Sequence, residues 1–181
     1  MGTVTTKLMT VSEFLELPER MDVRRELHEG EVFELTKPAF KHIRIQRRLM
    51  DLLSPVADRF GFLTLEFPFR AEPEHHLWTA DVGFIQQRRV ASVPLEGFLP
   101  GSPDLVIEVE SPSNSAREFA QRQRVCLSTG TQEFWIVYPD DKEVHVTTAD
   151  GRFRSYGPVD TLETPLLLGL KLAVADIFNA E

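Results

Sequence analysis

The chain has 181 residues and 42% apolar side chains, which is the size and composition of one globular domain over residues 1–181. No apolar run is long enough to span a bilayer, Met1–Lys7 lacks a signal-peptide core, and the single cysteine, Cys126, cannot form an internal disulfide. A cytoplasmic protein is therefore expected. The formal charge of −8 argues against coating nucleic acid by charge alone, but not against a nuclease, because metal-binding acids add to the negative total.

The first half of the chain predicts two helices, a hairpin and a strand. A capping box at Thr10–Glu13 predicts a short helix through Leu17, and residues 24–35 read as a hairpin. Apolar residues at helical spacing predict a long helix over residues 38–60. Leu63–Phe69 alternates as a half-buried strand, and Pro68 places it toward a sheet edge.

The second half predicts strands around one further helix. Residues 78–85 form the strand that contains Asp81, and Gln86–Ser102 reads as a loop. Asp104–Glu110 is the next strand, which Ser111–Ser113 ends. A second capping box at Ser115–Glu118 opens a helix that ends near Gly130. Three more strands are expected, at residues 133–138, 143–147 and 153–156. This order predicts a mixed sheet with helices on its faces.

Two acids stand in otherwise apolar stretches of neighbouring predicted strands. Asp81 lies within Leu77–Ile85, and Glu108 lies within Asp104–Glu110. Charged side chains are rarely buried unless they are paired or bind metal. Two adjacent carboxylates repel each other, and a divalent cation is the simplest way to keep both ionised. The pair therefore predicts a Mg²⁺ or Mn²⁺ site, with Glu26 as a third acid flanked by chain that should pack.

A solvated face is the competing interpretation of the Glu108 strand. Side chains alternate across a sheet, so Asp104, Glu108 and Glu110 share one face. The next helix should cross back over the sheet, and these acids have no alternating basic partner along the strand. Both points favour a functional site over a solvated face of the strand.

Several segments taken together resemble the Uma family of putative restriction endonucleases, within the PD-(D/E)xK nuclease superfamily. They are Arg25–Val32, Lys41–His42, Pro103–Ser113, and Gly130 with Glu133–Val137. The resemblance runs from about Thr10 to Phe178, and Pro103–Ser113 is its most specific part.

The resemblance implies an α/β (α+β) restriction-endonuclease-like fold, a central mixed β-sheet flanked by α-helices. It also implies a Mg²⁺- or Mn²⁺-dependent endonuclease acting on DNA. Asp81 and Glu108 take the metal-binding positions, and the carbonyl of Val109 completes the shell. Glu26 matches the acid that the N-terminal part of the fold often supplies. Ala80 replaces the proline of the superfamily motif.

The largest departure is at Glu110, which stands where the superfamily has its lysine. In related sequences a basic residue on the next helix serves instead, and here that position is Arg122. Arginine is always protonated, so it can steady a phosphate but cannot act as a general base. An ordinary pair between Glu118 and Arg122, four residues apart on a helix, is the alternative interpretation.

Three further hypotheses stay open from the sequence. The missing lysine and the acidic charge fit a catalytically degenerate module that binds nucleic acid or a protein partner without cleavage. A structural or oligomeric protein with solvated acids is another hypothesis. A homodimer through the edge strand Leu63–Phe69 is the third.

Weaker candidates lie on or near the long helix. His42 lies early in the long helix, where it could face the site, although a partly exposed surface histidine is the default interpretation. His75–His76 is an adjacent pair that would chelate one ion poorly. Lys41, Arg44, Arg47 and Arg48 make the outer side of the helix basic. Such a run can track a phosphate backbone, although it is more often a solvated helix face.

Overall fold

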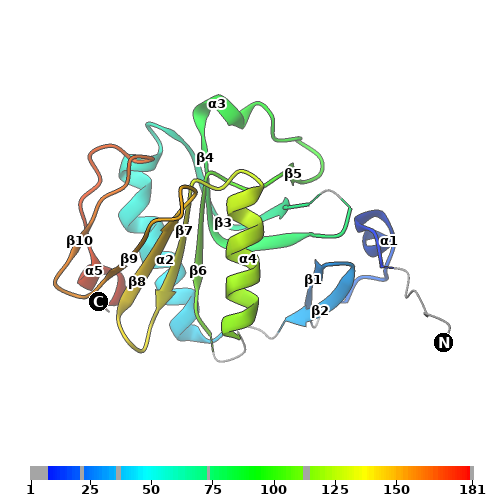
Figure 1. The fold of residues 1–181 in the computed structure, drawn as a ribbon, viewed down its shortest axis with the longest axis horizontal. Coiled ribbons are helices and arrows are strands. Elements are labelled where there is room, and N and C mark those ends of the chain that lie inside the picture. The colour runs from blue at the N-terminus through cyan, green and yellow to red at the C-terminus, as the bar shows by residue number, and fades with distance from the viewer. Residues whose placement is uncertain (1–7, 21–22, 36–37, 73, 112–114, 180–181) are drawn as a thin grey trace.

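A seven-stranded mixed sheet forms the centre of the computed structural model, which describes residues 8–20, 23–35, 38–72, 74–111 and 115–179 (Figure 1). Its spatial order is β5-β3-β4-β6-β7-β8-β9. The strands are β3 (Gly61–Arg70), β4 (Trp78–Gln86), β5 (Leu99–Pro100), β6 (Leu105–Val109), β7 (Glu133–Tyr138), β8 (Glu143–Thr148) and β9 (Phe153–Tyr156). Strand β6 runs parallel to β7 and antiparallel to β4, so the sheet is mixed, as expected.

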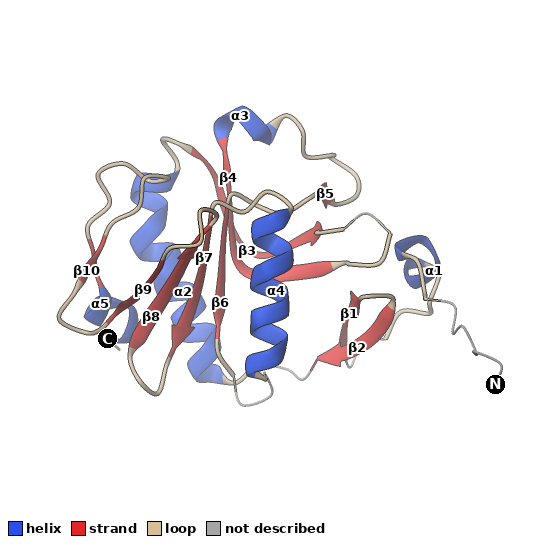
Figure 2. Ribbon diagram, viewed as in Figure 1, coloured by secondary structure: helices blue, strands red, loops and turns tan. Residues whose placement is uncertain are grey.

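Two helices cover opposite faces of this sheet (Figure 2). Helix α2 (Phe40–Ala57) lies behind the sheet in this view, and α4 (Ala116–Ser128) crosses in front of it. The α2 face buries Leu105 and Ile107 of β6, whereas the α4 face buries Val106. Because both faces are covered, all five residues of β6 are buried. The expected helix-flanked mixed sheet is confirmed.

Local sequence explains where the capped helices begin and end. Thr10 and Glu13 form the capping box of α1 (Val11–Leu15), and Ser115 and Glu118 form that of α4. Helix α4 is followed by Gly130 at φ +131°, a conformation that L side chains rarely adopt.

An N-terminal hairpin docks beside the N-terminal end of β4. Strands β1 (Arg24–His28) and β2 (Glu31–Leu35) are joined by Glu29 and Gly30, both at positive φ, as two-residue hairpin turns require. Leu27 exchanges two backbone hydrogen bonds of 3.0 Å with Leu77. This attachment carries the neighbouring Glu26 against the chain that enters β4.

The C-terminal segment packs against α2 on its face of the sheet. Strands β10 (Thr161–Leu162) and β11 (Leu172–Ala173) pair with each other and lead into α5 (Val174–Phe178). Leu162, Val174 and Ile177 belong to the same apolar cluster as Leu49 of α2.

Several expected boundaries need correction or fall outside the description. The expected loop Gln86–Ser102 contains the short helix α3 (Gln87–Val90) and strand β5. Strand β3 meets β5 only at Phe69 and Arg70, so its expected edge character holds over most of its length. Pro112 and Ser113 of the expected break lie outside the described residues.

None of the helices in the described part of the chain has both the length and the apolarity needed to cross a membrane.

Candidate active site where strands β4 and β6 separate

Asp81 and Glu108 meet where β4 and β6 stop pairing. The antiparallel ladder runs through Phe84–Leu105, Gly83–Val106 and Val82–Ile107 and stops there, so Asp81 and Glu108 are the next residues along the two strands. There Asp81 Oδ2 accepts the backbone N–H of Val109 at 2.7 Å, in the place of a ladder bond. The two acids are therefore cross-strand neighbours, and both are buried.

Glu108 is buried without enough partners. Its Oε1 lies 3.2 Å from Arg122 Nε, but this ion pair lacks hydrogen-bond geometry, and neither atom has another partner. Burial raises the pKa of Glu108 well above its usual value; Arg122 opposes the rise, and Asp81 and Glu26 add to it. The solvated-face interpretation is wrong, because Glu108 is 5% exposed and α4 covers it.

Arg122 reaches from α4 to the carboxylates of Glu108 and Glu26. Its Nη2 lies 3.2 Å from Glu26 Oε1 and donates to the carbonyl oxygen of Thr79 at 2.9 Å. Burial alone would lower the pKa of Arg122, but Glu108 and Glu26 raise it above its usual value. The guanidinium also lies 5.3 Å from the ring centroid of Trp78. The alternative interpretation, a surface pair with Glu118, is wrong, because Glu118 caps α4 instead.

Glu26 anchors Arg122 from the docked hairpin. The Glu26 carboxylate also accepts from Arg24 at 3.1 Å, from the backbone N–H of Thr79 at 2.9 Å, and contacts His28 at 2.9 Å. Burial alone would raise the pKa of Glu26, but Arg122, His28 and Arg24 lower it to about 2. Glu26 is thus a fixed carboxylate that holds the arginine in place.

Helix α2 supplies two partners of Asp81. His42 Nε2 lies 3.1 Å from Asp81 Oδ1, and Gln46 Nε2 donates to the same oxygen at 2.9 Å. His42 is therefore not the surface histidine that the sequence favoured. The two residues stand four positions apart, so one face of α2 directs both toward Asp81.

Glu66 is a site residue that the sequence analysis missed. Gln46 Nε2 donates to Glu66 Oε1 at 2.7 Å as well as to Asp81, and Arg24 also pairs with Glu66. Glu66 stands opposite Asp81 in the β3–β4 register, but φ is +50° and the ladder omits the pair. A non-glycine residue in this region is strained, and such residues concentrate at functional sites.

The strain at Glu66 coincides with a change of face along β3. Leu63 and Leu65 pack in the α2 cluster, whereas Phe67 and Phe69 pack in the α4 cluster. In a regular strand all four would share one face. The apolar alternation is unbroken in the sequence, so no sequence signal marks the change.

The other candidates lie apart from this constellation. Asp104, at the opposite end of β6, pairs at 3.1 Å with Arg89, a partner that α3 supplies from outside the strand. Burial raises the pKa of the Cys126 thiol to about 12, as suits a packed cysteine. His75 Nδ1 donates to the carbonyl oxygen of Met9 at 3.0 Å, in the N-terminal part of the structure.

Comparisons with known proteins agree with this fold. One solved structure, described as a putative nuclease belonging to DUF820 from Anabaena variabilis ATCC 29413, is 25% identical with a TM-score of 0.80. The match covers 94% of this chain and 97% of that one. No curated protein matches the chain. The model of the family Uma2, described as "Putative restriction endonuclease", matches residues 11–175, and the chain therefore belongs to this family.

Proposed function

We propose that this protein is a Mg²⁺- or Mn²⁺-dependent endonuclease that hydrolyses phosphodiester bonds in DNA. The observation that carries the proposal is the meeting of Asp81 and Glu108 where β4 and β6 separate, with Glu108 Oε1 buried and lacking a hydrogen bond. The family and the similarity to a nuclease structure support the reaction class. A cytoplasmic location is part of the proposal, supported by the single, buried cysteine.

The residues present fit a hard cation held by few protein ligands. Mg²⁺ commonly binds one or two carboxylates and fills its remaining positions with water and substrate phosphate. Asp81 and Glu108 supply two carboxylates, and the carbonyl of Val109 is the proposed third donor. Within the described ranges no three His, Cys, Asp or Glu side chains are grouped to hold an ion. The proposed site therefore rests on two acids, which suits Mg²⁺ or Mn²⁺ better than structural zinc.

Each neighbouring residue has a physical role in this proposal. When bound, the ion supplies an activated water and neutralises charge on the phosphate. Arg122 keeps its proton and offers positive charge beside the acids, while Glu26 fixes its position. His42 and Gln46 orient Asp81 Oδ1. None of these groups replaces the missing lysine as a base.

A plasmid-cleavage assay with Mg²⁺ or Mn²⁺ tests the proposal. The wild-type protein should cut DNA, chelator should stop it, and Asp81→Asn and Glu108→Gln should each reduce the rate by about 100-fold or more. Glu143→Gln, which alters an exposed carboxylate on β8, should leave the rate unchanged. Cutting that survives chelator, or equal rates in Asp81→Asn and wild type, would remove the proposal.

A catalytically degenerate binding module is the second candidate function. It is favoured by Glu110 at the lysine position and by Arg122, whose cation already lies between Glu26 and Glu108. In this case Arg122 neutralises the acids and no ion enters. Calorimetric titration with Mn²⁺ distinguishes the two functions, because the degenerate module should give no heat that depends on Asp81.

A further inference from the structure

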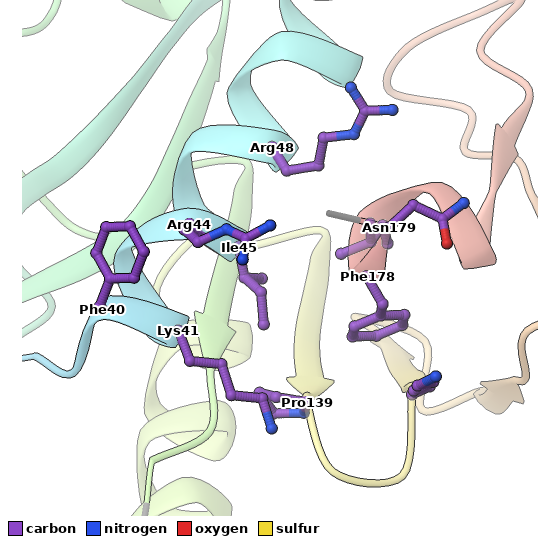
Figure 3. Close-up of a pocket in the computed structure, with 10 residues that line it drawn as sticks. Phe40, Lys41, Arg44, Ile45, Arg48, Pro139, Phe178 and Asn179 are labelled. Carbon is purple, nitrogen blue, oxygen red and sulfur yellow. The ribbon is translucent and has the colours of Figure 1, made fainter. Parts of the chain in front are cut away.

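A basic pocket lies on a different face of α2 from His42 and Gln46. The cavity, of about 330 Å³, is bounded by α2, the turn between β7 and β8, and the end of α5 (Figure 3). Figure 3 shows the side chain of Lys41 extending from α2 toward Pro139 of the turn, while the ring of Phe40, at the start of α2, points away from Phe178 of α5. The pocket has no part in the arrangement of acids described above.

Positive charge gathers at this pocket although the chain is acidic. Four cations line it, and no carboxylate does. Lys41 pairs with the exposed Asp140, and Arg48 Nε donates to the carbonyl oxygen of Asp176 at 2.8 Å. Arg44 and Lys142 form no ion pair with any residue that the structure describes. The pocket therefore suits an anionic ligand that would pair with these two cations.

The backbone of Lys142 adds a second observation. Lys142 lies at φ +57° in the turn between β7 and β8, where glycine would be relaxed. A turn of this shape does not need a long cationic side chain, yet the chain carries one at the mouth of the pocket. Strained non-glycine residues of this kind often mark ligand contacts.

An exposed aromatic ring completes the site. Phe40, the first residue of α2, is 75% exposed, and the guanidinium carbon of Arg44 lies 6.0 Å from its ring centroid. A ring beside unpaired cations is the combination that stacks a base and holds its phosphate. In a duplex the faces of a base are covered by its neighbours, so such a ring selects an unpaired base.

We propose that this pocket binds one unpaired nucleotide of a nucleic-acid strand, with its phosphate on Arg44 and Lys142 and its base on Phe40. The inference rests on the proposed action on nucleic acid, and it identifies the part of the protein surface on which the nucleic-acid strand lies. Lys41 is the sequence neighbour of His42, which contacts Asp81. A strand crossing the N-terminal turn of α2 therefore meets the pocket and then the acids.

Fluorescence anisotropy with a labelled 12-nucleotide oligothymidylate in EDTA tests the pocket without cleavage. Arg44→Ala/Lys142→Ala should weaken binding about tenfold and reduce the slope of log K against log salt concentration by about 0.7, the value for one single-strand phosphate. Arg47→Ala/Arg152→Ala removes the same charge from surface ion pairs whose arginines are 75% and 85% exposed. This control pair should change binding less than about twofold.

Phe40→Ala separates base stacking from charge. It should weaken binding of oligothymidylate about fivefold and leave binding of an abasic strand unchanged. Thermal melting of each variant checks that it is folded. Equal losses in the pocket pair and the control pair, an equal effect of Phe40→Ala on both strands, or no binding by the wild type would overturn the inference.

These results stand apart from the test of the proposed endonuclease. A wild-type protein that binds the strand in EDTA but never cuts with Mg²⁺ would remove the endonuclease and keep the pocket. A protein that cuts DNA while the pocket pair binds as tightly as wild type would remove only the pocket.

Discussion

The two buried acids on one face of β6 differ in how their charges are satisfied. Asp104 precedes the strand and is 1% exposed, and its oxygens receive Arg89, the backbone N–H of Gln86 and the amide of Gln132. Glu108, four residues on, is nearly as buried, but its Oε1 accepts no hydrogen bond and faces Asp81 and Arg122. The same strand thus carries one saturated carboxylate and one unsaturated carboxylate.

This difference separates the structural role of Asp104 from the candidate functional role of Glu108. A buried carboxylate with full partners fixes neighbouring chain segments, and here Asp104 ties β4 and β7 to the start of β6. A buried carboxylate that lacks partners raises the free energy of the fold unless a ligand or cation completes it. Burial alone did not distinguish the two acids, but the count of their partners does.

Asp104→Asn should have the largest effect on stability. The change leaves the partly exposed Arg89 without the buried carboxylate that it pairs with, and losing one partner of a buried pair costs on the order of 4 kcal/mol. Urea unfolding at pH 7 should show a lower midpoint, with Mn²⁺ affinity unchanged in the folded protein. A loss below about 1 kcal/mol would mean that Asp104 is no more structural than Glu108.

Glu26→Gln should have the next largest effect, and one that depends on pH. The pKa of Glu26 falls from a usual 4.5 to about 2 on folding, so its contribution is complete above pH 4.5 and is lost as the pH falls toward 2. That shift corresponds to roughly 3 kcal/mol. The stability gap between wild type and Glu26→Gln should thus be about 3 kcal/mol at pH 7 and should fall to about 1 kcal/mol by pH 2.5, as measured by urea midpoints. A gap independent of pH would contradict the ion pairs drawn for Glu26.

Glu108→Gln should change stability by less than about 1 kcal/mol. It removes a buried charge that is repelled by Asp81 and Glu26, while Glu26 still pairs with Arg122. The same variant should lose Mn²⁺ binding in calorimetry. If Glu108→Gln destabilised the protein as much as Asp104→Asn, the contrast between the two ends of β6 would fail.

Glu66→Gly should have the smallest effect, seen best against Glu66→Ala. Both changes remove the carboxylate that contacts Gln46, but only glycine relieves the left-handed backbone at φ +50°. Glycine should therefore give the more stable variant by about 1 kcal/mol in urea unfolding. An alanine variant as stable as the glycine variant would show that the backbone at Glu66 is not left-handed.

Local patterns in the sequence were enough to predict most of the elements and the placement of Asp81 and Glu108 on neighbouring strands. Two capping boxes set the starts of α1 and α4, and the alternation along β6 placed Leu105 and Ile107 opposite Glu108. The adjacency of Asp81 and Glu108 followed from one antiparallel connection between strands. Each of these predictions depends on residues close together in the sequence or on two strands joined by a single connection.

The parts that the sequence missed depend on contacts between distant segments. Glu66 reads as an outward residue of a regular strand, because the change of face along β3 comes from packing against two different layers. Gln46 carried no sequence signal, and only the placement of α2 over β4 brings it and His42 to Asp81. The partner of Asp104, Arg89, lies on a short helix within an expected loop.

The central claim is that Asp81 and Glu108 together bind a divalent cation. The most direct measurement is the anomalous signal from a crystal of the wild-type protein soaked in Mn²⁺, with Glu108→Gln crystals as the control. The account predicts one strong peak within coordination distance of both carboxylates in the wild type and none at that place in Glu108→Gln. A guanidinium of Arg122 between Glu26 and Glu108 with no manganese beside Asp81, or a peak unchanged in Glu108→Gln, would contradict it.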